Sequence, residues 1–273
     1  MKKFTFLLIF YSSCVMAQDV KFMTYNLRYD NPGDGENQWS LRKEYLKDQI
    51  RFYEPDIFGI QEGVYHQVQY LDNQLTTYTY VGVGRDDGKT KGEFSALYFK
   101  KDWELQEQGT FWLSETPDKV SVGWDASMER VCTFAKLKRD DITIWVFNTH
   151  FDHIGMEARK NSVTLILDKI KQYAKNEKII LMGDLNLEPE TEPIQMLKTF
   201  LNDSHDIADV RFGPTGTFNG FDFLKPVTRR IDYIFVHKDL IVKKHGILSD
   251  SKDMKYPSDH LPVIATIDFG GMK

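Results

Sequence analysis

The chain has 273 residues, of which 41% are hydrophobic, 27% charged and 14% aromatic, and its formal net charge at pH 7 is -5. This composition supplies one substantial hydrophobic core, which excludes a disordered chain, a collagen and a coiled-coil rod. The acidic balance also excludes the globally basic surface that favours general binding of nucleic acid.

Residues 1–17 have the pattern of a secretion signal peptide. Two lysines precede a short apolar run, and small residues lead up to Ala17. The apolar run is far shorter than the roughly 20 residues of a membrane-spanning helix, and we expect no transmembrane segment elsewhere. We therefore expect cleavage after Ala17 and export of residues 18–273 to the periplasm or the extracellular space. If Cys14 is instead a lipoprotein processing site, the protein is lipid-anchored.

Strand-forming runs recur along the rest of the chain, and helical patterns are fewer. We expect strands at residues 20–25, 56–61, 78–83, 94–99, 131–138, 142–148, 178–182, 231–236 and 261–267. Apolar residues at three- and four-residue spacing predict a helix at 163–173, and 41–52 and 64–75 are further helix candidates. Because no repeat or linker divides the chain, residues 18–273 are expected to form one α/β or α+β domain.

Polar side chains stand at the ends of several expected strands. They are Asn26 after the first strand, Glu62 after the second, His150 and Asp152 after the sixth, Asp184 and Asn186 after the seventh, and Asp259 and His260 before the last. Strand ends at one edge of a sheet converge in space even when they are far apart in sequence. The sequence therefore predicts one site rich in carboxylates.

Some of these positions also have an ordinary structural explanation. Asp184 and Asn186 follow an apolar strand that stops at Gly183, and a simple turn favours the same residue types. Glu62 has a similar alternative as the cap of the helix that follows it. Asp232 is harder to explain in this way, because it lies within an apolar run and needs a partner, for which a histidine would serve.

The chemistry of these groups favours a hard divalent cation. The segment 148–153 alternates histidine and aspartate, which would suit zinc. However, one cysteine remains after signal cleavage, and the other conspicuous polar positions are carboxylates and amides, the oxygen ligands of magnesium. Such an ion surrounded by histidines is suited to the hydrolysis of a phosphoester.

Six motifs in the chain resemble those of the endonuclease/exonuclease/phosphatase superfamily, in the same order and at similar spacing. They are Tyr25-Asn26, Gln61-Glu62, Asn148-Thr149-His150, Gly183-Asp184-Leu185-Asn186, Arg230-Ile231-Asp232-Tyr233 and Ser258-Asp259-His260. The resemblance implies a four-layer αββα sandwich. In this fold two central, mixed but mostly antiparallel sheets pack face to face, helices lie outside, and a metal site lies at one end.

The resemblance also implies residues that hold the metal ion and activate water. Glu62 would be the main magnesium ligand, with Asn26 and Asp259 nearby in the metal shell, and manganese is the alternative ion. Asp184 would align or deprotonate the attacking water, and Asn186 would orient this water and hold a phosphate oxygen.

The resemblance also implies which residues bind the phosphate. His260 would contact the phosphate, with its charge and tautomer fixed by Asp232, and His150 would donate to another non-bridging oxygen. Arg130 is a candidate for a bidentate phosphate contact. Asp152 and His153 either shape the substrate pocket or cap the helix that follows them.

Arg28 departs from the pattern of several nuclease members, which have an acid at this position. A cation here would repel a second metal ion and attract a phosphate, which disfavours the DNA-repair subgroup. The few short basic groups of the chain also disfavour nucleic acid as a substrate. Two aromatic segments, at 111–117 and 213–221, have two explanations. They contact a sugar or nucleotide ring of the substrate, or they pack in the hydrophobic core.

We therefore expect an exported, monomeric, magnesium-dependent phosphoesterase that hydrolyses a monoester or diester of a small organic phosphate by attack of water. Three alternatives remain: a secreted nuclease, a sphingomyelinase-like phosphodiesterase and a catalytically silent binding module. The intact set of Glu62, Asp184, Asn186 and His260 disfavours the silent module.

Overall fold

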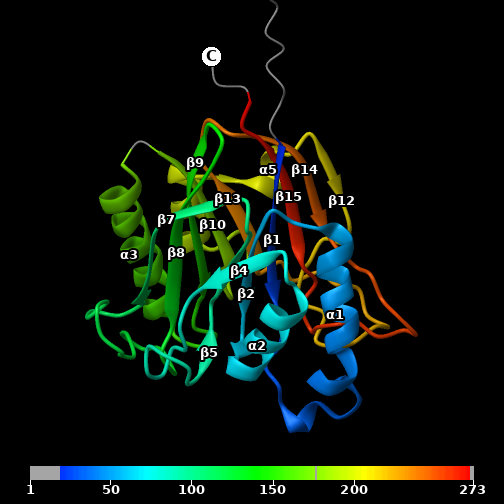
Figure 1. Cartoon of the computed structure of the whole chain (residues 1–273). Helices are drawn as coiled ribbons and strands as arrows, with labels where there is room; N and C mark the ends of the chain where they lie inside the picture. Colours follow the sequence, from blue (N-terminus) through cyan, green and yellow to red (C-terminus); the bar gives the residue numbers. More distant parts are fainter. Residues whose placement is uncertain (1–18, 176, 271–273) are drawn as a thin grey trace, which may run out of the picture.

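A computed structural model describes residues 19–175 and 177–270, so the expected signal peptide and Cys14 lie outside the described residues. Within these ranges, no helix combines the length and the apolar character that crossing a membrane requires. The described residues contain two large sheets, one two-stranded sheet and the helices that flank them (Figure 1).

The larger sheet has seven strands: β1 (Asp19–Asn26), β2 (Ile57–Gln61), β4 (Tyr78–Val81), β6 (Leu97–Lys100), β12 (Val210–Phe212), β14 (Ile241–Ile247) and β15 (Val263–Asp268). Their order is β12-β14-β15-β1-β2-β6-β4. The β1–β2 and β12–β14 pairs are parallel, and the other pairs are antiparallel.

The second sheet has six strands: β7 (Glu104–Trp112), β8 (Val131–Arg139), β9 (Ile142–His150), β10 (Lys178–Asp184), β11 (Asn202–Asp203) and β13 (Asp232–Val236). Their order is β11-β13-β10-β9-β8-β7, and β9 and β10 form the parallel pair. A small third sheet joins β3 (Gly63–Val64) to β5 (Glu93–Phe94).

The buried side chains fall into three groups, which define four layers. The first group lies between the two large sheets, where side chains of β1 and β2 meet those of β9 and β10. The second group packs the outer face of the six-stranded sheet against α3 (Met156–Ala174) and α4 (Glu192–Phe200). The third packs the outer face of the seven-stranded sheet against α1 (Trp39–Tyr53) and α2 (Tyr65–Gln74). This arrangement is the expected αββα sandwich.

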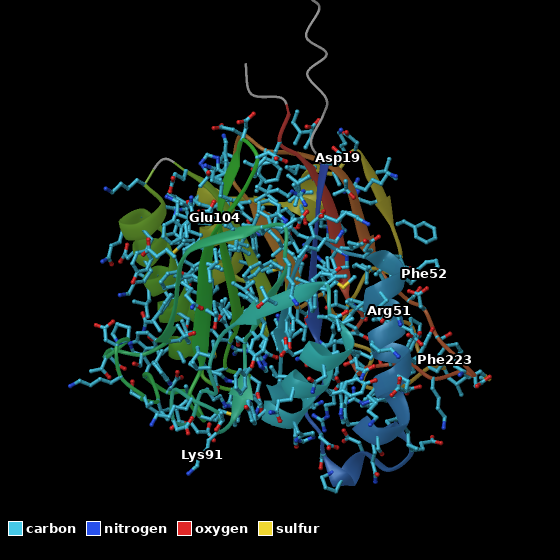
Figure 2. All side chains as sticks on the ribbon, viewed as in Figure 1. Asp19, Arg51, Phe52, Lys91, Glu104 and Phe223 are labelled. Carbon is cyan, nitrogen blue, oxygen red and sulfur yellow. The ribbon has the colours of Figure 1, made fainter. Side chains whose placement is uncertain are left out.

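The figures show how these layers are arranged and filled. In Figure 1, α3 lies at the left edge and α1 at the right, with the sheets between them. Side chains fill the space between the ribbons in Figure 2, where Phe52 of α1 projects outwards and is 81% exposed. The remaining helical segments are the short α5 (Ser204–Ile207) and the 3-10 helix η1 (Pro32–Asn37).

Side chains alternate between the two faces of each central strand, and the inward-facing positions at the strand ends place polar residues at one end of the sandwich. In β10, Ile180 and Met182 face the core between the sheets, and Asp184 takes the next position on the same face. The same alternation places Asn26 at the end of β1, beyond Phe22. Register brings the neighbouring strands into line, because Asp184 pairs with His150 of β9 and with Asp232 of β13.

Asn148 ties the two sheets together. Its Nδ2 donates to the carbonyl oxygens of Ile60 and Ala96, each at 2.9 Å, and its Oδ1 accepts a hydrogen bond of 2.6 Å from Gln61 Nε2. A Cβ atom at Gly59 would lie 2.4 Å from Asn148 Oδ1, so the close approach of the sheets requires glycine at this position.

Some of the expected elements differ from those observed. The expected strand at 94–99 is two strands, β5 and β6, because the chain between them turns so that the carbonyl of Ala96 accepts hydrogen bonds from Ile60 N and from Asn148. The expectations also omit β7, β14 and α4. The first five residues of β7 are exposed, and Lys243 and Lys244 interrupt the apolar alternation of β14, which contains a bulge.

Candidate active site

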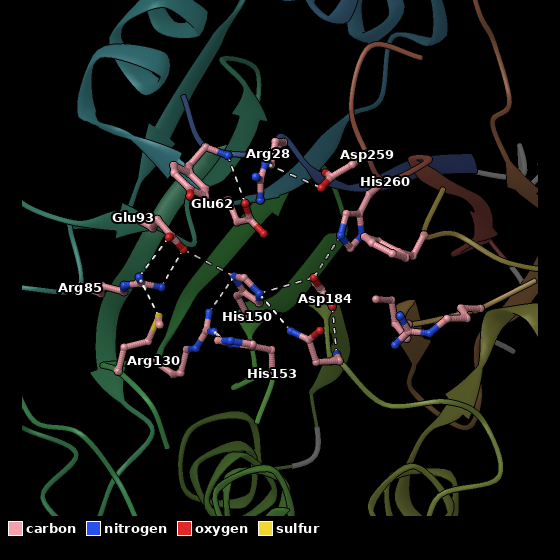
Figure 3. Close-up of a pocket in the computed structure, with 16 residues that line it drawn as sticks. Arg28, Glu62, Arg85, Glu93, Arg130, His150, His153, Asp184, Asp259 and His260 are labelled. Atoms are coloured by element: carbon pink, nitrogen blue, oxygen red, sulfur yellow. Dashed lines mark hydrogen bonds and ion pairs between the residues drawn. The ribbon is translucent and has the colours of Figure 1, made fainter. Parts of the chain in front are cut away.

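A cavity of about 720 Å³ opens at the end of the sandwich where the polar strand ends meet. Figure 3 shows the side chains that line it. Among the site residues expected from the sequence, those in its wall are Glu62, Arg130, His150, His153, Asp184, Asn186, Asp259 and His260. Asn26, Asp152 and Asp232 are buried and lie outside this lining set. The cavity therefore has a carboxylate and histidine wall with a further polar layer behind it.

Asn26 holds two carboxylates at this wall. Its Nδ2 donates to Glu62 Oε1 at 3.0 Å and to Asp184 Oδ2 at 2.9 Å, and its Oδ1 accepts from the backbone N–H of Arg28. The backbone N–H of Tyr29 donates to the other oxygen of Glu62 at 3.1 Å. The end of β1 and the loop after it thus fix the carboxylates that end β2 and β10.

The backbone at the site is strained at several positions. Arg28, Glu62 and Asn186 have φ values of 56°, 62° and 49°, in the left-handed region that side chains other than glycine rarely adopt. Gly183 has φ 146°, and a Cβ there would overlap the carbonyl oxygen of Thr149 in the neighbouring strand. This explains why a glycine directly precedes Asp184.

His260 is held as a buried cation. Its Nδ1 lies 2.9 Å from Asp232 Oδ2, and its Nε2 lies 3.7 Å from Asp184 Oδ2. Burial alone would lower the pKa of His260, but the carboxylates of Asp232 and Asp184 raise this pKa well above its ordinary value of 6.5. The histidine partner expected for Asp232 is therefore present.

His150 has the opposite character, since it is held neutral. Burial, and then the charge of Arg130, lowers the pKa of His150 well below its ordinary range. Arg130 Nη1 lies 3.1 Å from His150 Nδ1, and an arginine can only donate, so Nδ1 accepts and the ring proton is on Nε2. Nε2 lies 3.5 Å from Asp184 Oδ2, which places an N–H group beside this carboxylate.

Asn186 fixes Asp184 from the other side. Its backbone N–H donates to Asp184 Oδ1 at 2.9 Å, and its side-chain Nδ2 donates to the carbonyl oxygen of Phe151 at 3.0 Å. Asn186 Nδ2 also lies 3.2 Å from His150 Nε2. Because His150 Nε2 carries the ring proton, we interpret this last approach as a contact between two donors.

Arg130, Asp152 and His153 form a connected group beside His150. Arg130 Nη2 lies 3.0 Å from His153 Nδ1, and Arg130 Nε lies 3.4 Å from Asp152 Oδ2. Asp152 also accepts hydrogen bonds from the backbone N–H groups of Ile154 and Gly155, just before α3. Asp152 thus binds the loop that precedes α3 rather than the helix itself, because the N–H groups of Glu157 and Ala158 in the first turn donate to Asp125. His153 lines the cavity. Every nitrogen of Arg130 already has a partner, and its phosphate contact stays a prediction.

Two lining residues that sequence reasoning missed are Arg85 and Glu93. Their side chains form a bidentate pair, with Nη1–Oε2 and Nη2–Oε1 distances of 2.6 and 3.0 Å. Glu93 Oε2 lies 3.8 Å from His150 Nδ1, so this pair extends the wall beyond the histidine. The sequence signal was weak, namely the glycines Gly84 and Gly92 that flank a polar loop.

The carboxylate end of the cavity fits a divalent cation. Ligand atoms of Glu62, Asp184 and His260 lie within 4.8 Å of one another. Burial, and then the charge of Asp232, raises the pKa of Asp184 to about 7, and burial raises the pKa of Asp259 to about 6. Such shifts show carboxylates crowded in a poorly solvated place, which a cation would relieve. Because a protonated His260 carries a hydrogen on both ring nitrogens, oxygen atoms are the available ligands, as a hard cation prefers.

Comparison with known proteins agrees with this geometry. A model of the Endonuclease/Exonuclease/phosphatase family matches residues 23–260. An endonuclease/exonuclease/phosphatase family protein from Bacteroides thetaiotaomicron, of known crystal structure, is 37% identical with a TM-score of 0.90, over 93% of this chain and 99% of that chain. A mannosyl-6-phosphatase from the same organism is 39% identical with a TM-score of 0.88, over 92% of this chain and 100% of that chain.

A more distant relative comes from yeast. A probable RNA exonuclease from Saccharomyces cerevisiae is 30% identical over 206 residues, which are 64% of this chain and 39% of the yeast protein. The chain therefore spans well under half the length of that relative, whereas it spans the two bacterial structures almost completely. From its αββα fold, its site geometry and the match over residues 23–260, the chain belongs to the Endonuclease/Exonuclease/phosphatase family.

Proposed function

We propose that the protein is an exported, magnesium-dependent phosphatase that hydrolyses the phosphomonoester of a small organic molecule. The observation that carries this proposal is the position of Asp184, a buried carboxylate beside the cation His260, the neutral His150 and the second carboxylate Glu62. The nearly full-length similarity to a mannosyl-6-phosphatase supports a monoester substrate. The pattern of residues 1–17 supports export.

Different residues of the site would perform different parts of the reaction. Glu62, with Asn26 and Asp259 nearby, would hold the cation, which when bound would neutralise charge on the phosphate. Asp184 would orient a water molecule and accept its proton as the water oxygen attacks phosphorus. The P–O bond to the leaving group would break at the same time, and the departing alkoxide would take a proton from solvent to become the alcohol.

Three further groups stabilise and position the reacting atoms in this proposal. His260, charged through its pairing with Asp232, and the Nε2–H of His150 would donate to phosphate oxygens as negative charge develops on them. The backbone N–H of Asn186 keeps Asp184 in place. None of these steps needs a covalent intermediate with the protein.

The surroundings of the cavity favour a small substrate over nucleic acid. A second hollow, of about 750 Å³, shares Asn186 and Arg229 with the cavity. Its lining includes four carboxylates, those of Glu157, Glu188, Glu190 and Glu192. The same lining contains the cations Arg159, Lys160 and Arg229, and the last two are paired with Glu192 and Glu188. A nucleic-acid strand leaving the site on this side would therefore not meet the continuous basic path that its phosphates favour. A nuclease is the second candidate, because a probable RNA exonuclease is among the relatives.

A substrate panel tests the proposal, with release of inorganic phosphate measured for the monoesters and formation of cleaved fragments measured for the diesters and nucleic acids. With Mg²⁺, the purified protein should hydrolyse sugar phosphates and phenyl phosphate much faster than a phosphodiester, sphingomyelin, an RNA oligonucleotide or plasmid DNA. Faster cleavage of RNA or DNA than of the monoesters would favour the nuclease, and no turnover of any of these compounds would contradict both candidates.

A second experiment tests the metal site itself. Glu62→Gln should raise the Mg²⁺ concentration needed for half-maximal activity by at least about 10-fold, because it removes a ligand charge. It should also reduce the increase in thermal stability that Mg²⁺ gives the wild type, since a bound ion stabilises the folded state. Glu192→Gln is the matched control on an exposed side chain. An unchanged Mg²⁺ response in both measurements would contradict the role of Glu62.

A further inference from the structure

We propose that Arg85 and Glu93 bind hydroxyl groups of the substrate, so that the protein acts on phosphorylated sugars or polyols. This inference rests on the proposed phosphatase function and adds the residues that select the alcohol part of the substrate. Both side chains line the cavity that contains Asp184 and His260. Figure 3 shows the pair on the far side of His150 from Asp184.

The loop that carries the pair is held rigidly by its own backbone. In the segment 84–93, Gly84 N donates to Lys89 O, Arg85 N to Glu93 O and Asp86 N to Lys91 O, at distances of 3.0 to 3.1 Å. Because the loop is ordered by these bonds, Arg85 and Glu93 are positioned before any substrate enters, which reduces the entropy lost on binding.

The two flanking glycines make this folding possible. A Cβ at Gly84 would overlap the backbone of Lys91, and a Cβ at Gly92, whose φ is 79°, would overlap the carboxylate of Asp86. Glu93 also pairs with Val64 in the small sheet formed by β3 and β5. The loop is thus attached to the chain segment that directly follows Glu62.

The Arg85–Glu93 pair has no evident role in holding distant parts of the fold together. It joins residues eight positions apart within one loop, and its side chains are only 12% and 17% exposed. Removing two charges from water is costly, and a pair between neighbours in one loop brings little stability in return. A functional role in the cavity explains the position of the pair better.

The chemistry of the pair matches that of an alcohol. After the bidentate contact, Nη1 of Arg85 keeps one N–H, whereas the second N–H of Nη2 donates to the sulfur of Met128, and each oxygen of Glu93 keeps accepting capacity. A hydroxyl group donates and accepts at once, so neighbouring hydroxyls on a sugar fit a carboxylate beside a guanidinium. Met128 Sδ, 3.1 Å from Arg85 Nη2, adds a polarisable surface for the carbon atoms of the ring.

The distance from the reacting centre also suits a sugar phosphate. Glu93 lies 3.8 Å from Nδ1 of the His150 ring, and Asp184 lies 3.5 Å from Nε2 of the same ring. One imidazole ring therefore separates the pair from the carboxylate that would align water. For a phosphate placed at Asp184, the Arg85–Glu93 pair is therefore within reach of the hydroxyl groups of a small ester.

A comparison of two substrate types tests this inference. Glu93→Gln and Arg85→Gln should each lower kcat/KM for mannose 6-phosphate and glucose 6-phosphate by roughly 10- to 100-fold, as expected for the loss of a hydrogen bond to a charged group. The kcat/KM for phenyl phosphate, which has no hydroxyl groups, should change by less than about 3-fold. Lys91→Gln is the matched control, because Lys91 lies in the same loop but projects into solvent at the lower edge of Figure 2.

Each possible result either supports or overturns the inference that Arg85 and Glu93 bind substrate hydroxyl groups. An equal loss for both substrate types would mean that the pair acts on the phosphate or on His150, and no loss for either would mean that it does not touch substrate; both results overturn the inference. If the wild type hydrolyses none of these compounds, the proposed function fails, and titration with methyl mannoside followed by NMR tests the pair alone. Binding that Glu93→Gln abolishes would support the inference, whereas absent or unchanged binding would overturn it.

Discussion

The two walls of the cavity are built in different ways. The strand wall consists of residues at or near the ends of β-strands, namely Glu62, His150, Asp184 and His260, with Asn26 buried behind them. The loop wall consists of Arg85, Glu93, Met128 and His153, which lie in or beside loops. The register of two sheets fixes the first wall, whereas local hydrogen bonds fix the second.

This difference suggests a division of labour. The strand wall contains the coupled carboxylates and histidines, whose chemistry depends on separations of 2.9 to 3.7 Å that only a rigid frame maintains. The loop wall contains the groups that we expect to recognise the alcohol. Changes in the strand wall should therefore affect all substrates, and changes in the loop wall should affect the choice among them.

The largest expected effect is that of His260→Ala. It removes the positive charge beside the phosphate and leaves Asp232 buried without its partner, so kcat should fall on the order of 10²- to 10³-fold. The loss should be similar for mannose 6-phosphate and phenyl phosphate in steady-state assays. His237→Ala, in the partly exposed loop after β13, is the control and should leave kcat unchanged. A loss confined to sugar phosphates would contradict the expectation that changes in the strand wall affect all substrates.

Asn148→Ala tests the frame that supports the strand wall. Two backbone carbonyls and the amide of Gln61 would lose their buried partner, so the free energy of unfolding should fall by about 3 kcal/mol. Urea unfolding measures this change. Asn202→Ala, which removes a more exposed amide, should cost less than about 1 kcal/mol. Equal stability of the two variants would mean that the sheets do not depend on this contact.

The smallest expected effect concerns the pH dependence of stability away from both walls. His245 of β14 is buried, with Nδ1 2.9 Å from Ser204 Oγ, and burial, then His205, lowers the pKa of His245 to about 3. A histidine in the unfolded chain has a pKa of about 6.5. Below pH 6.5 the unfolded chain therefore binds a proton that the folded chain does not, and stability falls until the pH reaches about 3.

The size of this effect follows from the same values. At pH 5 the contribution of His245 should amount to about 2 kcal/mol relative to pH 8. His245→Gln should lose this part of the pH dependence in urea unfolding, while the ratio of activities on mannose 6-phosphate and phenyl phosphate stays the same. A pH slope identical to that of the wild type would show that His245 does not titrate in this way.

The strand wall could be located from the sequence because its signals are local. An apolar run that stops at a polar residue reports a buried strand and its end, as for Ile180 to Asp184. Asp232 was informative for a similar reason, since a carboxylate inside an apolar run requires a partner, and the structure provides His260. The family resemblance added the order of the motifs and the expected sandwich, which the comparisons confirm.

The loop wall could not be located in this way. Arg85 and Glu93 stand among polar residues with no periodic pattern, and they reach the cavity only because the loop folds back on Gly84 and Gly92. The contacts of Asp152 with Ser127 and Arg130 were equally hidden from the sequence, because they depend on the packing of segments more than 20 residues apart. Such positions are set by tertiary structure rather than by the residues beside them.

The self-contained bonding of segment 84–93 has a consequence for how new specificities arise. Several of its backbone hydrogen bonds close within the segment, while the pairing of Glu93 with Val64 and the indole of Trp112, which donates to Arg85 O at 2.8 Å, anchor it from outside. Side chains at the tip of such a segment are exchangeable at little cost to the sheets beneath it, because the backbone bonds that shape the loop do not depend on them. Related hydrolases would in this way keep the same reaction at the strand wall and change their substrate preference at the loop wall.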